Sequence, residues 1–109
     1  MISFHTIARH AQKAKVGHNH FWHVAFLTKG GAIVAIGYNH DNIHAEAHAL
    51  SQVWPDHRPG LVLWSYRLAK GGRLAMAKPC EDCQSLMRSD GVLRVRYSDS
   101  EGKIQNLKL

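Results

Sequence analysis

Hydrophobic residues in the first part of the chain recur at two different spacings. Apolar side chains at helical spacing after Ser3, a preferred N-cap residue, predict a helix that ends near Ala14. The apolar runs 22–28 and 32–38 flank a glycine-containing turn at residues 29–31, which is typical of two antiparallel strands joined by a hairpin. The chain is therefore expected to begin with one helix and a hairpin.

Helices and strands alternate in the rest of the sequence. Residues 43–54 are rich in Ala, Glu, His and Leu and stop before Pro55, which predicts a second helix. The later elements are a strand at 61–68, a turn at 69–72, an extended piece at 73–78, a helix at 80–89, a strand at 92–98, a turn at 99–102 and a last strand at 103–109. In strand 92–98 we expect Leu93, Val95 and Tyr97 on one face, with Arg94 and Arg96 on the other.

These elements fit a single α/β domain over residues 1–109. We predict three layers, in which three helices flank a mixed central sheet of about five strands. A crossover connection makes strand 92–98 parallel to strand 61–68, whereas the tight turn at 99–102 makes the last strand antiparallel to its neighbour. A domain of 109 residues buries a small core, so a bound metal or a partner subunit would add stability.

Charge is distributed unevenly along the sequence. The formal net charge is +6, and no acidic residue precedes Asp41. The basic residues of this first part are interleaved with histidines and aromatic residues, which is typical of a surface that contacts phosphates or bases. They are Arg9, Lys13, Lys15 and Lys29. An ordinary solvated basic face has the same composition and stays an alternative.

Targeting and membrane segments are not evident in the sequence. No apolar stretch is long and uninterrupted enough to span a bilayer, and the N-terminus lacks the apolar core and cleavage site of a secretory signal. We therefore expect a cytoplasmic protein without a membrane partner. The acid-free N-terminus shares some features with organelle transit peptides, but its helical spacing favours a core helix.

Two cysteines three positions apart supply candidate metal ligands. In the first turn of a helix, Cys80 and Cys83 project in the same direction, so both thiolates can bind one ion. His44, predicted in the first turn of another helix, can provide a third ligand. Two thiolates and one imidazole are a set that catalytic zinc uses, with water in the fourth position. Both helix N-termini would then face the metal.

Glu46 stands two residues after His44, where it can reach a metal-bound water without joining the coordination shell. Zinc lowers the pKa of bound water to about 7. A carboxylate beside that water can take a proton and pass it on, a contribution of about 10²–10⁴ in rate. The spacing therefore predicts a hydrolytic site in which Glu46 is both acid and base.

Two short motifs carry these residues. His-Ala-Glu at 44–46, followed by Pro-Cys-Glu-Asp-Cys at 79–83, resembles the H-x-E…P-C-x-x-C signature of the cytidine deaminase superfamily. The order of elements agrees with that family over most of the chain: a helix, a hairpin, a helix bearing H-x-E, a strand and a helix opened by P-C-x-x-C. The resemblance implies a cytidine deaminase-like fold and zinc-dependent hydrolytic deamination of cytosine.

The resemblance also implies a role for individual residues. The Zn²⁺ ligands would be His44, Cys80 and Cys83, and the catalytic acid and base would be Glu46. Asn39 takes the place of the asparagine that contacts the sugar, and Ala45 and Pro79 take places beside the substrate. The substrate would be a nucleoside, a nucleotide or a single-stranded nucleic acid, and the protein is expected to form a homo-oligomer as family members commonly do.

Two departures bear on the branch of the family. The segment before P-C-x-x-C, 61–78, is longer than the usual strand because it contains the turn at 69–72. The turn at 99–102 leaves no room for a helix between the last two strands, which resembles the cytidine deaminase branch and disfavours the tRNA-adenosine and APOBEC-like branches. Free-cytidine enzymes usually carry cysteine in the place of His44, whereas some deaminase toxins and RNA-editing domains combine histidine with the hairpin. Free and polymeric substrates both stay open, as does a deaminase acting on adenine or guanine.

The ligand residues are also compatible with other kinds of site. A C-x-x-C pair also occurs in redox dithiols and in structural zinc sites. His48, one helical turn after His44, can complete a closed Cys₂His₂ set. The chain would then be a non-catalytic zinc-stabilised domain that binds nucleic acid through its basic N-terminal half. A metalloprotease H-E-x-x-H is excluded because Glu46 stands at the wrong offset.

The remaining histidines and large aromatic residues are expected to have ordinary structural positions, and no catalytic role is assigned to them. We predict surface or loop positions for His18, His20, His23 and His40. We predict core or interface positions for Trp22, Trp64 and Tyr66.

Overall fold

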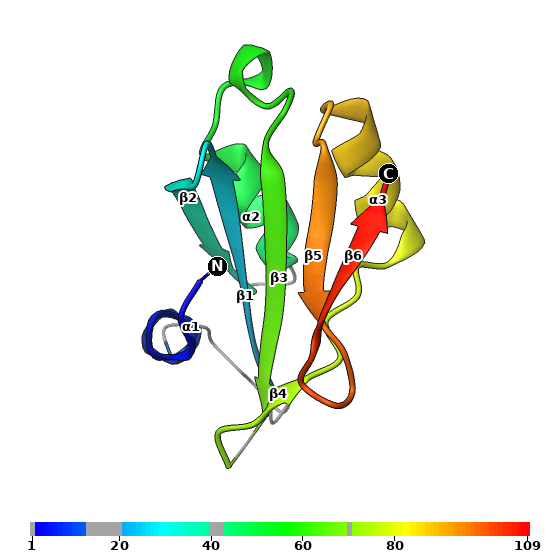
Figure 1. The fold of residues 1–109 in the computed structure, drawn as a ribbon. Coiled ribbons are helices and arrows are strands. Elements are labelled where there is room, and N and C mark those ends of the chain that lie inside the picture. The colour runs from blue at the N-terminus through cyan, green and yellow to red at the C-terminus, as the bar shows by residue number, and fades with distance from the viewer. Residues whose placement is uncertain (1, 13–20, 40–42, 70) are drawn as a thin grey trace.

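A mixed six-stranded sheet forms the centre of the computed structural model, which describes residues 2–12, 21–39, 43–69 and 71–109. Along the chain the elements are α1 (Phe4–Ala11), β1 (Phe21–Lys29), β2 (Ala32–Tyr38), α2 (Ala45–Ser51), the short 3₁₀ helix η1 (Pro55–His57), β3 (Val62–Ala69), β4 (Leu74–Ala75), α3 (Glu81–Ser89), β5 (Arg94–Ser98) and β6 (Ile104–Lys108). The strand order is β2-β1-β3-β5-β6, and β4 pairs with the C-terminal end of β3 (Figure 1).

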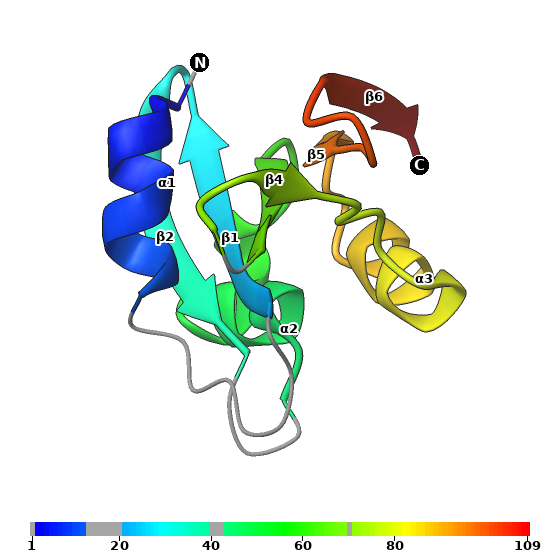
Figure 2. The same cartoon turned by 90° about the horizontal axis from the view of Figure 1, so that it is seen from below.

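The three α-helices of the described residues lie on both faces of the sheet (Figure 2). α1 covers one face, where Phe26 of β1 shares a buried cluster with Ile7 of the helix. α2 and α3 cover the opposite face, where Leu27 shares a second cluster with Leu50 and Met87. Successive residues of β1 therefore serve two different cores, because side chains alternate across a strand. The predicted three-layer α/β fold class is confirmed.

The strand pairings agree with those predicted from the turns. β1 and β2 are antiparallel around Gly30 and Gly31, whose φ angles are 57° and 85°. Positive φ at both turn positions is the requirement of a tight hairpin, and glycine meets it without a steric penalty. β3 and β5 are parallel, and β5 and β6 are antiparallel. The absence of a helix between β5 and β6, expected from the length of the turn, is therefore confirmed.

The helices are shorter than the hydrophobic pattern predicted. The helix expected over 43–54 spans Ala45–Ser51, and the helix expected over 80–89 begins at Glu81. The extended piece expected over 73–78 pairs with β3 through only two residues, Leu74 and Ala75. In the part of the chain that the structure describes, no helix is long and apolar enough to cross a membrane.

The predicted position of Leu93 is wrong. β5 begins only at Arg94, so the alternation of the strand does not extend to Leu93, which is 54% exposed, whereas Val95 is fully buried. Trp64 and Tyr66 are buried in the core that α1 covers, as expected. Several predictions lie outside the described residues: those on Lys13, Lys15, His18, His20 and His40, and the end of the first helix at Ala14.

Gly37 allows α2 to lie directly on β2. A Cβ atom built on Gly37 would collide with the carbonyl oxygen of Ala45 and the amide nitrogen of Ala49, and it would lie 2.9 Å from the Cα of Ala49. These neighbours are helix backbone, which cannot rotate away as a side chain can. The absence of a side chain at Gly37 therefore sets the distance between the sheet and the helix that carries Glu46.

We expect Gly37→Ala to lower the free energy of unfolding by about 3 kcal/mol, because the added methyl group overpacks a contact between two backbones. Urea unfolding followed by circular dichroism measures this change. Gly31→Ala is the matched control: its Cβ would meet nothing within 4 Å, so only its left-handed backbone should cost about 1 kcal/mol. Equal losses for the two variants would show that helix contact at Gly37 is unimportant.

Candidate metal centre

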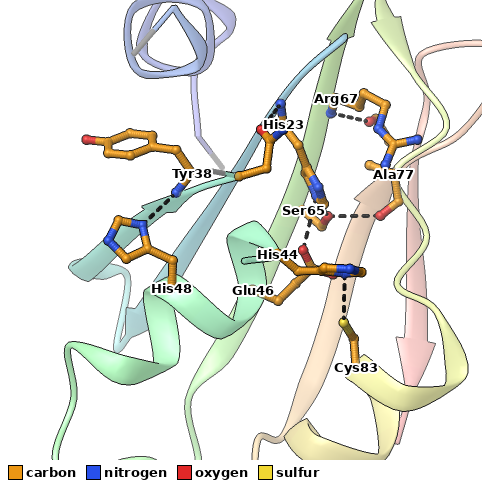
Figure 3. Close-up of polar contacts among 11 residues, drawn as sticks. His23, Tyr38, His44, Glu46, His48, Ser65, Arg67, Ala77 and Cys83 are labelled. Atoms are coloured by element: carbon orange, nitrogen blue, oxygen red, sulfur yellow. Dashed lines mark hydrogen bonds and ion pairs between the residues drawn. The ribbon is translucent and has the colours of Figure 1, made fainter. Parts of the chain in front are cut away.

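Three predicted ligand residues converge between α2 and α3. One nitrogen of His44 and the sulfurs of Cys80 and Cys83 all lie within 4.8 Å of one another. Nδ1 of His44 is 3.4 Å from Sγ of Cys83, and Figure 3 shows the imidazole directed toward that sulfur. His44 and Cys80 are exposed, whereas Cys83 is buried in the core beneath the site. The cluster is thus open to solvent on one side.

Two of these residues are helix N-caps, which corrects their predicted place in a first turn. His44 precedes α2 and Cys80 precedes α3, both with extended backbone, and their carbonyl oxygens accept the first helical hydrogen bonds. N-cap side chains usually accept a hydrogen bond from the helix backbone, but neither of these does. Neither helix therefore has a side-chain hydrogen bond at its N-cap. The His44 and Cys80 side chains are not used for capping and are available as ligands.

The loop before Cys80 is held by polar contacts to the sheet and to α3. Nε2 of Gln84 donates to the carbonyl oxygen of Pro79 at 2.9 Å, and this amide is buried. Two residues earlier, the carbonyl oxygen of Ala77 accepts a hydrogen bond of 2.9 Å from the hydroxyl group of Ser65 on β3. Cys80 therefore follows a segment that is anchored on both sides.

The donor set fits a zinc ion. Tetrahedral zinc with Zn–S and Zn–N bonds of about 2.3 and 2.05 Å separates sulfur and nitrogen ligands by about 3.6 Å. The distance between His44 and Cys83 is close to this value. Burial, together with the nearby Glu46 carboxylate, raises the pKa of the Cys83 thiol. A divalent cation would offset both effects, because it stabilises the thiolate directly.

Glu46 lies in the first turn of α2, and its side chain is only 2% exposed. It points toward the sheet beside His44 (Figure 3). Its Oε1 atom is fully buried, and no described group completes a hydrogen bond to that atom. A carboxylate in such surroundings is costly to bury, so packing alone does not account for its position beside the ligand cluster.

His23 belongs to this site and is not the surface or loop histidine that was expected from the sequence. It lies on β1, is 8% exposed, and its Nε2 atom is 3.3 Å from Oε1 of Glu46. The alternation of side chains along β1 could have predicted its burial. His23 is two and four residues before Ala25 and Leu27, so it projects from the same face of the strand, and these two residues face the core under α2 and α3.

Of the three predicted substrate residues, one contacts the backbone of His23 and two adjoin ligand residues in the chain. Oδ1 of Asn39 accepts a hydrogen bond of 3.1 Å from the backbone N–H of His23, which ties the end of β2 to β1. Ala45 is the first residue of α2 and is buried, and Pro79 is buried next to Cys80. Their contacts with a substrate stay predictions.

His48 has a structural contact of its own. Its Nδ1 atom accepts a hydrogen bond of 3.0 Å from the backbone N–H of Tyr38 on β2 (Figure 3). Among the described residues, the group of possible ligands at this cluster consists of His44, Cys80 and Cys83, without His48. The geometry therefore favours an open three-ligand site over the closed Cys₂His₂ set.

Comparison with known proteins identifies the fold. The structure is similar to that of the dCMP deaminase from the cyanophage S-TIM5, solved in apo form, with a TM-score of 0.65. The two chains are 22% identical over a match that covers 89% of this chain and 79% of the other. No protein-family model and no curated protein matches this sequence. The likeness confirms the predicted cytidine deaminase-like fold.

Proposed function

We propose that this protein is a zinc-dependent hydrolytic deaminase that converts cytosine to uracil in a nucleoside, a nucleotide or a single-stranded nucleic acid. One observation carries the proposal: His44, Cys80 and Cys83 meet beside the buried carboxylate of Glu46. The fold that it shares with a dCMP deaminase supports the same chemistry. A zinc ion that served only stability would give no reason to bury an acidic side chain at its edge.

In this proposal the three ligands hold the metal and Glu46 moves the protons. Zinc, when bound, supplies a water nucleophile near neutral pH. Glu46 takes a proton from the attacking water and delivers it to the ring nitrogen next to the reacting carbon. It then carries the remaining proton of that water to the exocyclic amine, so that a carbon–oxygen bond replaces the carbon–nitrogen bond and ammonia leaves.

In this proposal the substrate is bound by Asn39, Ala45 and Pro79. The amide group of Asn39 donates to the sugar, since its Oδ1 atom already accepts from His23. Ala45, the first residue of α2, and Pro79, in the loop before α3, each adjoin a ligand and contact the base in this proposal. A homo-oligomer is part of the proposal.

Ammonia release by the zinc-loaded protein tests the proposed function. The substrates to offer are cytidine, deoxycytidine, their monophosphates, and single-stranded DNA and RNA that contain cytosine. Turnover of free compounds would indicate a salvage-type enzyme, and turnover of polymer alone would indicate an editing enzyme or a toxin. Either outcome supports deamination of cytosine.

A protein that binds stoichiometric zinc and is silent with every cytosine substrate would contradict the proposal. The same assay with adenine and guanine compounds would then test the other bases. Binding of single-stranded nucleic acid without turnover of any base would instead support the non-catalytic zinc-stabilised domain, with affinity that falls steeply as salt increases.

A further inference from the structure

A histidine on the sheet stands directly behind the proposed catalytic carboxylate. Nε2 of His23 lies 2.7 Å from Oγ of Ser65 and 3.3 Å from Oε1 of Glu46 (Figure 3). All three residues are buried, with exposed fractions of 8% for His23, 0% for Ser65 and 2% for Glu46. The strand register explains the arrangement: Ser65 is paired with Ala25, two residues beyond His23, so both side chains project from the face that α2 covers.

The position of the ring hydrogen follows from counting hydrogens. Ser65 has one hydroxyl hydrogen, and it is donated to the carbonyl oxygen of Ala77 at 2.9 Å. The oxygen of Ser65 must therefore accept, rather than donate, in its contact with His23. His23 consequently carries its hydrogen on Nε2, the nitrogen that also faces Glu46.

The ring is neutral near pH 7. Burial lowers the pKa of His23, and this effect exceeds the opposing influence of the Glu46 carboxylate. A neutral imidazole has one N–H donor. Ser65 and Ala77 thus select the tautomer of His23, and the chain of contacts from Ala77 to Ser65 to His23 ends at Oε1 of Glu46.

The N–H of His23 changes the electrostatic surroundings of the Glu46 carboxylate. Its Oε1 atom is buried without a hydrogen bond from any described group, and the N–H of His23 is directed mainly at Ser65. The positive end of that N–H bond is nevertheless close to Oε1, and a small rotation of the ring would share the hydrogen between the two oxygens. A nearby donor lowers the cost of a buried carboxylate and restricts its rotamer.

We propose that His23 is a positioning residue for Glu46: its Nε2–H, held in place by Ser65, orients the carboxylate for proton transfer. The inference rests on the proposed function, because orientation of Glu46 matters only if Glu46 moves protons. His23 itself has no contact with the reacting atoms in this proposal. It acts through the carboxylate, as partners behind a reactive group commonly do.

Two substitutions at His23 test the proposal by kinetics. His23→Leu removes the donor, and we expect kcat to fall about 10- to 100-fold while KM changes by less than about threefold and zinc content is kept. His23→Gln offers an amide N–H from the same strand position and should recover most of the lost kcat. Thermal unfolding of both variants identifies any loss of fold. Equal activity of wild type and folded His23→Leu, or equal loss in both variants, would overturn the proposal.

A measurement independent of activity separates this proposal from the proposed function. In the zinc-loaded protein at pH 7, nitrogen-15 NMR of His23 should show hydrogen on Nε2 and none on Nδ1. Glu46→Gln should shift the Nε2 signal, whereas Glu81→Gln, an exposed acid on α3, should not. If the wild type deaminates none of the substrates, the proposed function fails, and these spectra still decide whether His23 contacts Glu46. Hydrogen on Nδ1, or a signal unmoved by Glu46→Gln, would refute the contact.

Discussion

Glu46→Gln is expected to lower the rate of deamination by about 10²–10⁴-fold while zinc stays bound. Glutamine keeps the volume of the side chain in a site that is 2% exposed, so the packing of α2 should be unchanged. What is lost is the group that accepts and returns a proton. The ligands are untouched, because the cluster consists of His44, Cys80 and Cys83.

The stability of Glu46→Gln should differ from that of most core variants. The carboxylate is costly to bury, and it raises the pKa of the neighbouring thiol of Cys83. Replacing it with a neutral amide should therefore leave the free energy of unfolding equal or higher. Steady-state kinetics, metal analysis and urea unfolding measure the three quantities on one preparation.

The control for this experiment is Glu81→Gln, which removes an exposed carboxylate from the first turn of α3. It has the same change of charge and should retain wild-type turnover. If Glu46→Gln kept more than about a tenth of the activity, the role of proton carrier would belong to another group. A loss of zinc together with activity would instead make Glu46 part of the coordination shell.

Removing either cysteine ligand should abolish stoichiometric zinc binding and turnover, but with different effects on stability. Cys80 is exposed, so Cys80→Ser should destabilise the protein only through the lost metal. Cys83 is also a member of the core with Leu63 and Met87. Cys83→Ser adds a buried hydroxyl group to the loss of metal and should cost about 1–3 kcal/mol more.

Chelation measures the contribution of the metal in the unmutated chain. Free zinc at about 100 times its Kd stabilises a folded protein by about 2.7 kcal/mol, which is about 10 °C in Tm for a domain of this size. We expect a fall of this order on adding a chelator, with full recovery when zinc is returned. In Cys80→Ser, neither chelator nor zinc should move Tm.

His48→Gln distinguishes an open site from a closed one. Because Nδ1 of His48 accepts from the backbone of Tyr38, the variant should lose some stability and keep its zinc. Measuring the zinc content of His48→Gln after dialysis shows whether His48 is needed to hold the metal. Loss of the metal in His48→Gln would establish a fourth protein ligand and favour the structural zinc domain over the enzyme.

The order of the elements could be predicted because its signals are local. The glycines at 30 and 31 define a hairpin, Pro55 limits α2, and the short turn after β5 excludes a helix there. The predicted first and last residues of the helices and strands were less accurate than their order. The pattern did not show that His44 and Cys80 stand just outside their helices, because an N-cap is defined by backbone angles and not by residue type alone.

Two residues show where a local pattern fails. Leu93 continues the apolar alternation of Val95 and Tyr97 in the sequence, yet it lies outside β5 and is exposed. His23 was expected at a surface or loop position, as most histidines are, although its alternation with Val24 along β1 places it on a buried face. In both cases the neighbouring strand or helix decides burial, and that neighbour is distant in sequence.

The existence of the helices and turns and the two motifs could be recognised locally, because hydrophobic spacing, glycine, proline and ligand spacing act over a few residues. Which of these residues are in contact depends on the folded chain. His44 and Cys83 are 39 positions apart and Ser65 is 42 positions from His23, yet both pairs are in contact. Such contacts depend on how the strands pair and on how closely α2 lies on Gly37, and both arise from packing of the whole sheet.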